Sequence, residues 1–258
     1  MNASFFTHGL VRSVSRSLGN CELVHQPRRP FDLELAIQQH AGYVAALDAA
    51  GVHVTILPEE PDFPDATFVE DTVLILDELA VICRLGTASR QLESEPMARV
   101  VACFRPVRRF AAPGTLEGGD VLQVGRTLFV GRSTRTNEDG IRQLEEIVKP
   151  LGYRVTPVTL DGCLHLQTGV ACPAAGLLLV NPAWIDLTPF RGFEILPVPI
   201  AEPWGANTLA VNGKVLVAES APETAELLQS RGLNVFRVDV SEFEKAEAGL
   251  TCLSVLFS

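Results

Sequence analysis

Residues 208–218 read Thr-Leu-Ala-Val-Asn-Gly-Lys-Val-Leu-Val-Ala, and this stretch decides how the rest of the chain is interpreted. Two apolar runs flank Asn212-Gly213, a dipeptide that readily takes positive φ at both central positions of a two-residue turn. The stretch therefore predicts two short antiparallel strands, Thr208–Val211 and Lys214–Ala218. A lone hairpin cannot bury its apolar face, so further strands or a helix must cover it.

Similar strand pairs occur earlier in the chain, each joined by a short turn. They are Asp71–Leu76 with Leu79–Arg84, Val121–Val124 with Thr127–Val130, and Gly169–Cys172 with Leu177–Val180. Single apolar runs follow at a distance and predict a third strand for each unit. These runs are Val52–Leu57, Val107–Phe110, Tyr153–Val158, Phe193–Val198 and Val235–Val240.

Helical patterns lie between most strand pairs and the third strand. The strongest is 137–151, in which Ile141, Leu144, Val148 and Leu151 recur at helical spacing. A second helix is predicted over about 32–50, with a buried face made by Leu33, Ile37, Val44 and Leu47. A third is predicted over about 220–231, because Ser220 and Glu223 have the spacing of a capping box.

The repeating unit is thus a strand pair, a helix and a strand, and it recurs about every 40 to 60 residues. One unit cannot bury both of its faces, whereas five units around an axis can. We therefore predict an α/β fold, a five-bladed α/β propeller formed by one domain over residues 1–258. A doubly wound parallel sheet is the competing interpretation, and the hairpins in nearly every unit count against it.

Composition excludes several classes of protein. The chain has 258 residues, of which 31 are acidic and 21 basic, so its net charge is −10. This charge argues against a nucleic-acid partner and is compatible with a cationic ligand. The apolar runs are too short to span a bilayer, so no membrane partner is expected, and the N-terminus lacks the pattern of a signal peptide. We predict a cytoplasmic protein.

Two residues are candidates for nucleophilic and acid–base chemistry. Cys252 lies just after Gly249, at the start of an apolar run near the C-terminus. A cysteine thiolate is the strongest side-chain nucleophile near neutral pH, although a buried structural cysteine is the commoner case for any one of the six cysteines. His165 lies where a loop enters a strand, a position from which an imidazole can point into a central cavity.

Acidic residues gather in two places. Glu117 and Asp120 surround Gly118-Gly119, and adjacent glycines allow close backbone approach. Asp65, Glu70 and Asp71 surround an apolar segment that enters a predicted hairpin. Acids at the edge of a core are unfavourable unless they are paired.

Two arginines complete the set of candidates. Arg90 and Arg135 lie in loops after a strand pair, at equivalent points of their repeats, where a guanidinium can bind a carboxylate in bidentate fashion. The histidines are scattered and no cysteine pair has ligand spacing, so no metal site is expected. The segment Glu117-Gly-Gly-Asp is not a phosphate-binding loop.

Taken together, these segments resemble the dimethylarginine dimethylaminohydrolases of the guanidine-modifying, amidinotransferase-related superfamily. The matching motifs are Phe63-Pro-Asp with Phe-Val-Glu-Asp71, Gly86 with Ser-Arg90, Pro113-Gly-Thr-Leu-Glu-Gly-Gly-Asp120, Gly131 with Arg135-Thr-Asn, Leu164-His-Leu, and Gly249-Leu-Thr-Cys-Leu-Ser254. The resemblance implies a five-bladed propeller, the pentein fold, with its active site on the central axis. It covers nearly the whole chain.

The resemblance also implies a role for each matching residue. Cys252 corresponds to the nucleophile, His165 to the general acid and base, and Glu117 to the acid that orients the histidine. The substrate-binding positions it implies are Asp65 and Asp71 for the guanidinium, Arg90 and Arg135 for the α-carboxylate, and Leu18 and Ala246 on the surrounding loops. Gln167 departs from the family pattern, which has a lysine after His-Leu.

The implied reaction is hydrolysis of an N-omega-methylated arginine to citrulline and an alkylamine, through a covalent S-alkylthiouronium on Cys252. It needs no cofactor, and the partner expected is this small-molecule substrate. A monomer and a homodimer are both compatible with the sequence. Two alternatives stay open: an arginine deiminase or amidinotransferase of the same superfamily, and a non-catalytic propeller that binds another protein.

Overall fold

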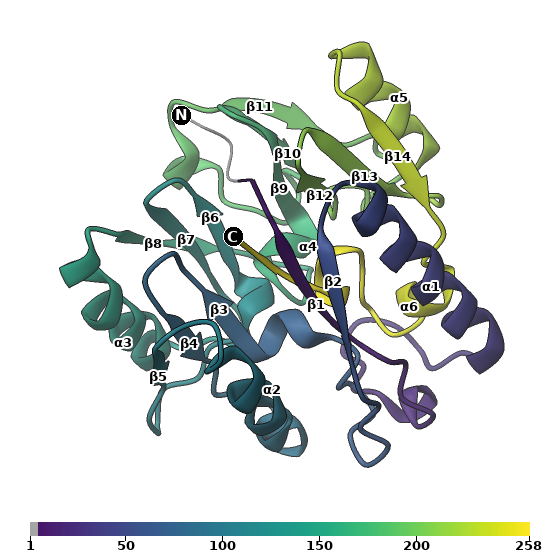
Figure 1. Cartoon of the computed structure of the whole chain (residues 1–258). Coiled ribbons are helices and arrows are strands. Elements are labelled where there is room, and N and C mark those ends of the chain that lie inside the picture. Colours follow the sequence, from purple (N-terminus) through teal and green to yellow (C-terminus); the bar gives the residue numbers. More distant parts are fainter. Residues whose placement is uncertain (1–4) are drawn as a thin grey trace.

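Five three-stranded sheets surround one axis in the computed structural model, which describes residues 5–258 (Figure 1). Each sheet contains one antiparallel pair and one parallel pair of strands. This pattern is the predicted strand pair followed by a strand that returns after a connection. The structure thereby confirms the five-bladed α/β propeller.

Four blades are continuous in the chain. The first contains β3 (Val73–Ile75), β4 (Ala80–Ile82), α2 (Ser94–Val101) and β5 (Val107–Arg109). The second contains β6 (Val121–Val124), β7 (Thr127–Arg132), α3 (Glu138–Val148) and β8 (Arg154–Thr159). The third contains β9 (Val170–Ala174), β10 (Leu177–Val180), the 3₁₀ turn η6 (Thr188–Phe190) and β11 (Glu194–Pro197). The fourth contains β12 (Leu209–Val211), β13 (Lys214–Ala218), α5 (Pro222–Ser230) and β14 (Val235–Val238).

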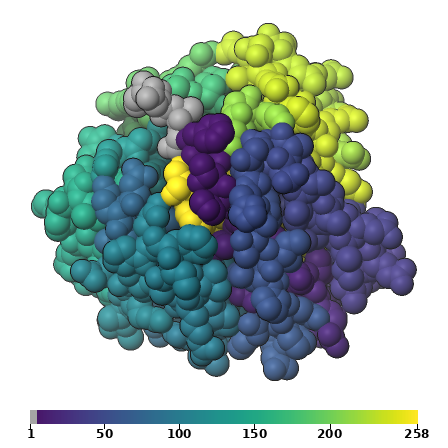
Figure 2. Space-filling model, viewed as in Figure 1, coloured from purple at the N-terminus to yellow at the C-terminus, as the bar shows by residue number. Residues whose placement is uncertain are grey.

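The fifth blade joins the two ends of the chain. Its elements are β15 (Val255–Phe257), β1 (His8–Arg12), α1 (Leu33–Ala49) and β2 (His53–Leu57). β1 pairs antiparallel with β15 and parallel with β2. Figure 2 shows C-terminal atoms, in yellow, directly beside the purple N-terminal strand. β1 is absent from the predicted strands because its partner in the hairpin-like pair comes from the opposite end of the sequence.

Two predicted helix starts are confirmed by their caps. The Asn137 side chain accepts a hydrogen bond from the Gly140 N–H (2.8 Å) at the start of α3. The Asp32 side chain accepts one from the Leu35 N–H (3.1 Å) at the start of α1. In both cases the cap satisfies an N–H that the helix itself leaves unpaired.

The predicted cap of α5 is wrong. Ser220 donates its hydroxyl to Glu244 instead of capping the helix. The carboxylate of Glu202 accepts from the N–H groups of Glu223 (2.8 Å) and Thr224 (2.7 Å). A carboxylate from a neighbouring segment therefore replaces the local serine, and its charge suits the positive end of the helix dipole.

The buried face of α1 also differs from the prediction. Ile37 is 51% exposed, whereas Ala36, His40, Tyr43 and Leu47 are buried at helical spacing. The Tyr43 hydroxyl shares a hydrogen bond of 2.7 Å with the Ser254 hydroxyl, so this face turns toward the last strand of the chain. His40 is buried on this face, and its Nε2 has no hydrogen-bond partner within residues 5–258.

Five short turns meet where the first strands of the blades begin near the axis, and we call them the axial turns. They are η2 (Val69–Thr72), η4 (Gly118–Asp120), α4 (Leu166–Gly169), residues 206–208, and η7 (Thr251–Leu253). η2 packs against both η4 and η7, and α4 packs against η4. Successive axial turns lie about 50 residues apart in the sequence, and the fold brings them together. Within residues 5–258, no helix has the length and apolar character required to cross a membrane.

Candidate active site

The nucleophile candidate lies in an axial turn. Cys252 is in η7, directly before β15, and its sulfur accepts a hydrogen bond from the Gly249 N–H (3.4 Å). Burial and the negative charges of Glu70 and Asp71 raise the pKa of the Cys252 thiol. The thiol therefore keeps its proton near neutral pH until a cation offsets these acids.

The histidine and its orienting acid meet as the sequence predicts. His165 is 5% exposed, and its Nε2 lies 2.7 Å from Glu117 Oε2 and 3.8 Å from Asp71 Oδ1. Burial would lower the pKa of His165, but the charges of Asp71 and Glu117 outweigh it and raise that pKa to about 9. Gly119 is required at this point, because a Cβ there would lie 2.9 Å from the His165 ring. The imidazole is thus held in its protonated form and can donate a proton.

Both candidate arginines are buried among these acids. Arg90 contacts Asp71 (3.0 Å) and Glu93 (3.0 Å) through its two Nη atoms. Arg135 makes a longer contact of 3.4 Å with Glu117 Oε1. The structure therefore gathers Arg90 and Arg135 beside Glu117 and His165 rather than on the surface.

The remaining predicted residues are Asp65, Leu18 and Ala246. Asp65 is 5% exposed, and its Oδ2 accepts from the Glu22 N–H (3.1 Å). Leu18 is completely buried in the hydrophobic core, in the N-terminal loop. Ala246 is buried and its N–H bonds to the Phe243 carbonyl (2.9 Å).

The residue after Ala246 ties two loops together. Glu247 has a φ of +58°, which is uncommon outside glycine. Its carboxylate accepts from the consecutive N–H groups of Val24 (3.0 Å), His25 (2.5 Å) and Gln26 (2.5 Å). The N-terminal loop is thereby fixed to the segment that leads into the nucleophile turn.

A second layer of residues lies beneath the cluster, and sequence reasoning gave none of them a role in the site. Glu70 Oε2 accepts from the Thr251 hydroxyl (2.9 Å), and Glu70 Oε1 accepts from Gln167 Nε2 (2.7 Å). Asn207 donates to the Gln167 carbonyl (3.1 Å) and to Thr251 Oγ1 (3.1 Å). Burial, and then the charge of Asp71, raise the pKa of Glu70 to about 8.

The shared position of these residues is the clue that could have identified them. Glu70, Gln167, Asn207 and Thr251 each belong to an axial turn and precede the first strand of a blade by a few residues. Aligning the repeats on those strands would have marked all four.

The carboxylates and the imidazole also have the geometry of a possible cation site. Ligand atoms of Asp71, Glu117 and His165 lie within 4.8 Å of one another, although the sequence analysis expected no metal site. The guanidinium of Arg90 already lies 3.0 Å from Asp71 and 3.9 Å from Glu117. An organic cation therefore offsets the charge of this cluster, in agreement with the way a guanidinium substrate would use it.

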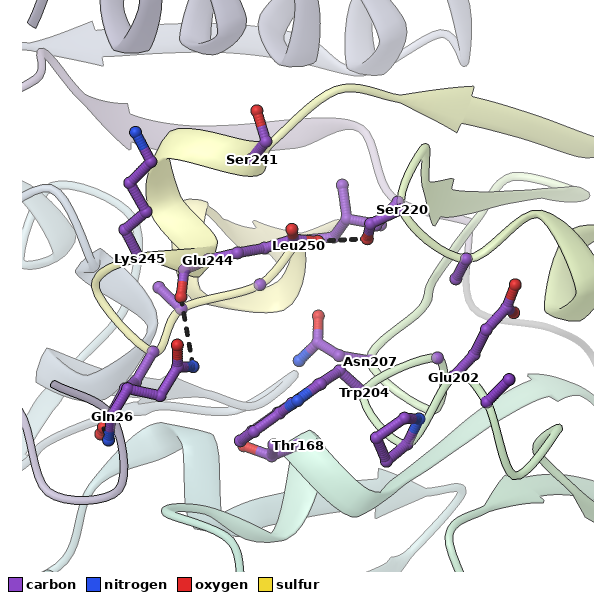
Figure 3. Close-up of a pocket in the computed structure, with 18 of the residues that line it drawn as sticks. Gln26, Thr168, Glu202, Trp204, Asn207, Ser220, Ser241, Glu244, Lys245 and Leu250 are labelled. Carbon is purple, nitrogen blue, oxygen red and sulfur yellow. Dashed lines mark hydrogen bonds between the residues drawn. The ribbon is translucent and has the colours of Figure 1, made fainter. Parts of the chain in front are cut away.

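Two cavities border the axial turns. One has a volume of about 430 Å³ and is lined by Thr168, Trp204, Asn207, Gly249 and Leu250 among others (Figure 3). The other has about 570 Å³ and reaches Glu70, Gln167 and Thr251 from the side of the hairpin turns. Neither cavity is lined by Cys252 or His165.

Comparison with known proteins agrees with this site. A model of the family described as "N,N dimethylarginine dimethylhydrolase, eukaryotic" matches residues 29–181. The chain is 37% identical to the N(G),N(G)-dimethylarginine dimethylaminohydrolase of Pseudomonas aeruginosa, over 98% of this chain and 100% of the relative. It is 40% identical to the Streptomyces coelicolor enzyme of the same name, over 95% of each chain.

The structural comparison extends over the same length. A crystal structure of the Pseudomonas aeruginosa enzyme, a cysteine-to-serine mutant complexed with citrulline, superposes with a TM-score of 0.94 at 36% identity. The match covers 98% of this chain and 100% of that one. The fold, the axial position of the cluster and the extent of the identity lead to one conclusion: the chain belongs to the dimethylarginine dimethylaminohydrolase family.

Proposed function

We propose that this protein hydrolyses N-omega-methylated arginine to citrulline and an alkylamine, with Cys252 as the nucleophile. The observation that carries the proposal is the meeting of residues from four axial turns. Cys252 comes from η7, Asp71 from η2, and the His165–Glu117 pair, at 2.7 Å, from the N-terminal ends of α4 and η4. The charge of Asp71 acts on both the Cys252 thiol and the His165 imidazole. Relatives that match the full chain are dimethylarginine dimethylaminohydrolases, and one is complexed with citrulline.

Binding would begin with exchange of one guanidinium for another. The substrate cation takes the place of Arg90 beside Asp71, with Asp65 as a second carboxylate. Arg90, released from Asp71, and Arg135 then bind the α-carboxylate of the substrate. The new cation next to the sulfur lowers the thiol pKa, so the thiol loses its proton to solvent when substrate binds.

The reaction then proceeds in two halves. The Cys252 thiolate attacks the guanidinium carbon, His165 donates its proton to the substituted nitrogen, and the alkylamine leaves. The product of this half is an S-alkylthiouronium on Cys252. His165, now neutral, takes a proton from a water molecule, and the resulting hydroxide attacks the same carbon. The C–S bond then breaks, the hydroxyl proton passes to the sulfur, and citrulline departs as the thiol is regenerated.

The test is turnover by Cys252→Ser beside Cys103→Ser, an exposed cysteine far from the cluster. Asymmetric dimethylarginine, monomethylarginine and arginine are supplied in parallel, and citrulline and the released amine are quantified. We expect Cys252→Ser to bind substrate and release no citrulline, while Cys103→Ser keeps wild-type rates. Turnover by the Cys252 variant would refute the assignment of the nucleophile.

The same assay separates the alternatives. Citrulline and ammonia from arginine, with no reaction of the methylated forms, would indicate an arginine deiminase. No product from any of the three, together with iodoacetamide labelling of Cys252 that substrate does not block, would indicate a non-catalytic propeller.

We also propose that the enzyme acts in the cytoplasm. All six cysteines are free in the structure, as expected where thiols stay reduced, and the proposed chemistry requires a reduced Cys252. The steps above use only groups of the chain, the substrate and water, and so require no cofactor. Cell fractionation with activity assays tests the location.

A further inference from the structure

One side chain contacts both segments that carry the catalytic chemistry. Asn207 Nδ2 donates to the Gln167 carbonyl (3.1 Å) in α4, the helix that follows His165. The same nitrogen donates to Thr251 Oγ1 (3.1 Å), and Asn207 Oδ1 accepts from the Thr251 N–H (3.3 Å). Both acceptors and the donor are at least 40 residues away in the sequence.

The nucleophile turn is shaped around this amide. A Cβ at Gly249 would lie 2.4 Å from Asn207 Oδ1, so the backbone of residue 249 rests directly on the side chain. The N–H of Gly249 is the donor to the Cys252 sulfur. The amide of Asn207 therefore sets the position of Gly249, and through it the position of the sulfur.

Asn207 itself is held by its own turn. Its N–H donates to the Trp204 carbonyl (3.1 Å), and Gly205 packs so closely on Thr224 that a Cβ would lie 2.3 Å from the threonine hydroxyl. In Figure 3, Asn207 lies at the inner wall of the cavity, between Thr168 and Leu250. The fourth blade thus contributes a fixed amide to a site whose other residues come from other blades.

We propose that Asn207 is a positioning residue that holds the Cys252 turn in register with the His165 segment. It touches neither substrate nor the reacting atoms in the proposed mechanism. It acts by keeping the sulfur at the distance from the imidazole that attack and proton donation require together. The kinetic part of this proposal rests on the proposed function, whereas its structural part does not.

The central variant is Asn207→Ala, with Thr208→Val as its matched control. Thr208 is the next residue, is buried, and its hydroxyl has no hydrogen-bond partner within residues 5–258. We expect Asn207→Ala to lower kcat by about 30-fold or more with KM changed by less than about threefold, because the sulfur is misplaced while the substrate-binding groups stay. Thr208→Val should retain both constants.

A second readout needs no substrate. The rate of Cys252 alkylation by iodoacetamide, followed by peptide mass spectrometry, should fall by about fivefold in Asn207→Ala at pH 7, because the sulfur loses the Gly249 N–H that favours its thiolate. If the wild type released no citrulline, the proposed function would fail while this measurement still decided the role of Asn207. Unchanged or faster alkylation in a variant with wild-type circular dichroism would overturn the positioning role.

A double-mutant cycle with Thr251→Val locates the effect. Asn207 and Thr251 share a hydrogen bond, so the losses in kcat caused by the two substitutions should be strongly non-additive. The kcat of the double variant should be close to that of the less active single variant. Asn207→Asp keeps the acceptor for the Thr251 N–H and loses both donors, so its kcat should fall between those of wild type and alanine. Additive losses would exclude coupling through the nucleophile turn.

Discussion

The acids around His165 differ in their nearest partners. Glu117 contacts the imidazole of His165. The hydrogen bond to this imidazole and the positive charge of His165 together lower the pKa of Glu117 despite its burial. Asp71 contacts the guanidinium of Arg90. Glu70 has only neutral donors, from Thr251 and Gln167, so burial and the charge of Asp71 dominate and its carboxyl is mostly protonated at neutral pH.

The charge of Glu117 should be visible in the pH dependence of catalysis. Glu117→Gln removes an anion that raises the pKa of His165, so the imidazole should lose its proton at lower pH than in the wild type. We expect kcat to fall by about 100-fold and the alkaline limb of the kcat profile to move down by about one pH unit or more. An alkaline limb at the wild-type position would show that Glu117 does not set the pKa of His165.

The protonation of the Glu70 carboxyl should change how the stability of the fold depends on pH. Burial raises the pKa of folded Glu70 to about 8, above the ordinary glutamate value of 4.5. The folded state therefore holds an extra proton between these values, and stability falls as pH rises through that window. Glu70→Gln removes this contribution. Between pH 6 and pH 8, the melting temperature of the variant should fall less than that of the wild type, by roughly 5 °C.

Gln167→Lys provides the complementary variant. An ammonium beside Glu70 would lower the pKa of that carboxyl, so this variant should also lose less stability at alkaline pH. Glu93 and Asp120, whose pKa values burial raises to about 7 and about 6, titrate in every variant and cancel in the comparison. Identical melting curves across pH for wild type and Glu70→Gln would contradict the raised pKa of Glu70.

At the scale of elements, the helix caps have unequal importance for the site. Asp32 caps α1 alone, whereas Asn137 caps α3 and also binds the loop before Glu117. The Asn137 side chain accepts from the Thr115 N–H (3.1 Å) and donates to the Pro113 carbonyl (3.0 Å). One residue thereby connects a helix to the strand-entry segment that places the orienting acid.

These two caps make a matched pair for mutation. Asn137→Ala and Asp32→Ala should each lower the free energy of unfolding by about 1 kcal/mol, the usual value for an N-cap. Only Asn137→Ala should lower kcat as well, by about tenfold, because Glu117 loses the support of its loop. Equal kcat values for the two variants, measured with unfolding curves in urea, would show that the loop before Glu117 keeps its place without Asn137.

The elements themselves were predictable because their determinants are local. The Asn212-Gly213 turn has φ values of +48° and +80°, as the sequence pattern requires, and pairs β12 with β13. The two errors came from tertiary contacts. Ile37 is exposed because α1 turns Tyr43 toward Ser254. Ser220 is not the cap of α5 because the Glu202 carboxylate accepts from an N–H of the first helical turn.

At the scale of the whole molecule, the site is made by closure of the propeller. Periodicity predicts blades, but it does not state which side chains of five axial turns touch. The roles of Cys252, His165 and Glu117 came from resemblance to a family, whereas Gln167, Asn207 and Thr251 form a network that no local pattern indicates. Pairing of β1 with β15 is a contact between sequence ends and is equally invisible in any short window.

The pairing of the ends predicts that the chain can be circularly permuted. The Thr7 N–H donates to the Phe257 carbonyl (3.0 Å), so a short linker can join Ser258 to Phe5. New ends placed at Gly192, an open position between β10 and β11, should leave the melting temperature within about 5 °C and kcat within about twofold. Removal of residues 255–258 should instead give an unfolded or insoluble chain, because the loss of β15 leaves β1 without its antiparallel partner.

The prediction that residues 1–258 form one domain has a direct test. Circular dichroism and intrinsic tryptophan fluorescence, which reports Trp184 and Trp204 beside the third and fourth blades, should give coincident thermal transitions. Two separated transitions would show that part of the ring unfolds on its own.

The five axial turns have a practical consequence for the life of the enzyme. Each blade supplies one of these turns, so local unfolding of any blade would remove part of the site. No blade should therefore unfold before activity is lost. Heat inactivation should therefore follow the same curve as the loss of ordered structure. An inhibitor that binds several of these turns at once would stabilise all of the blades that carry them. It should therefore protect distant helices from proteases as effectively as it blocks turnover.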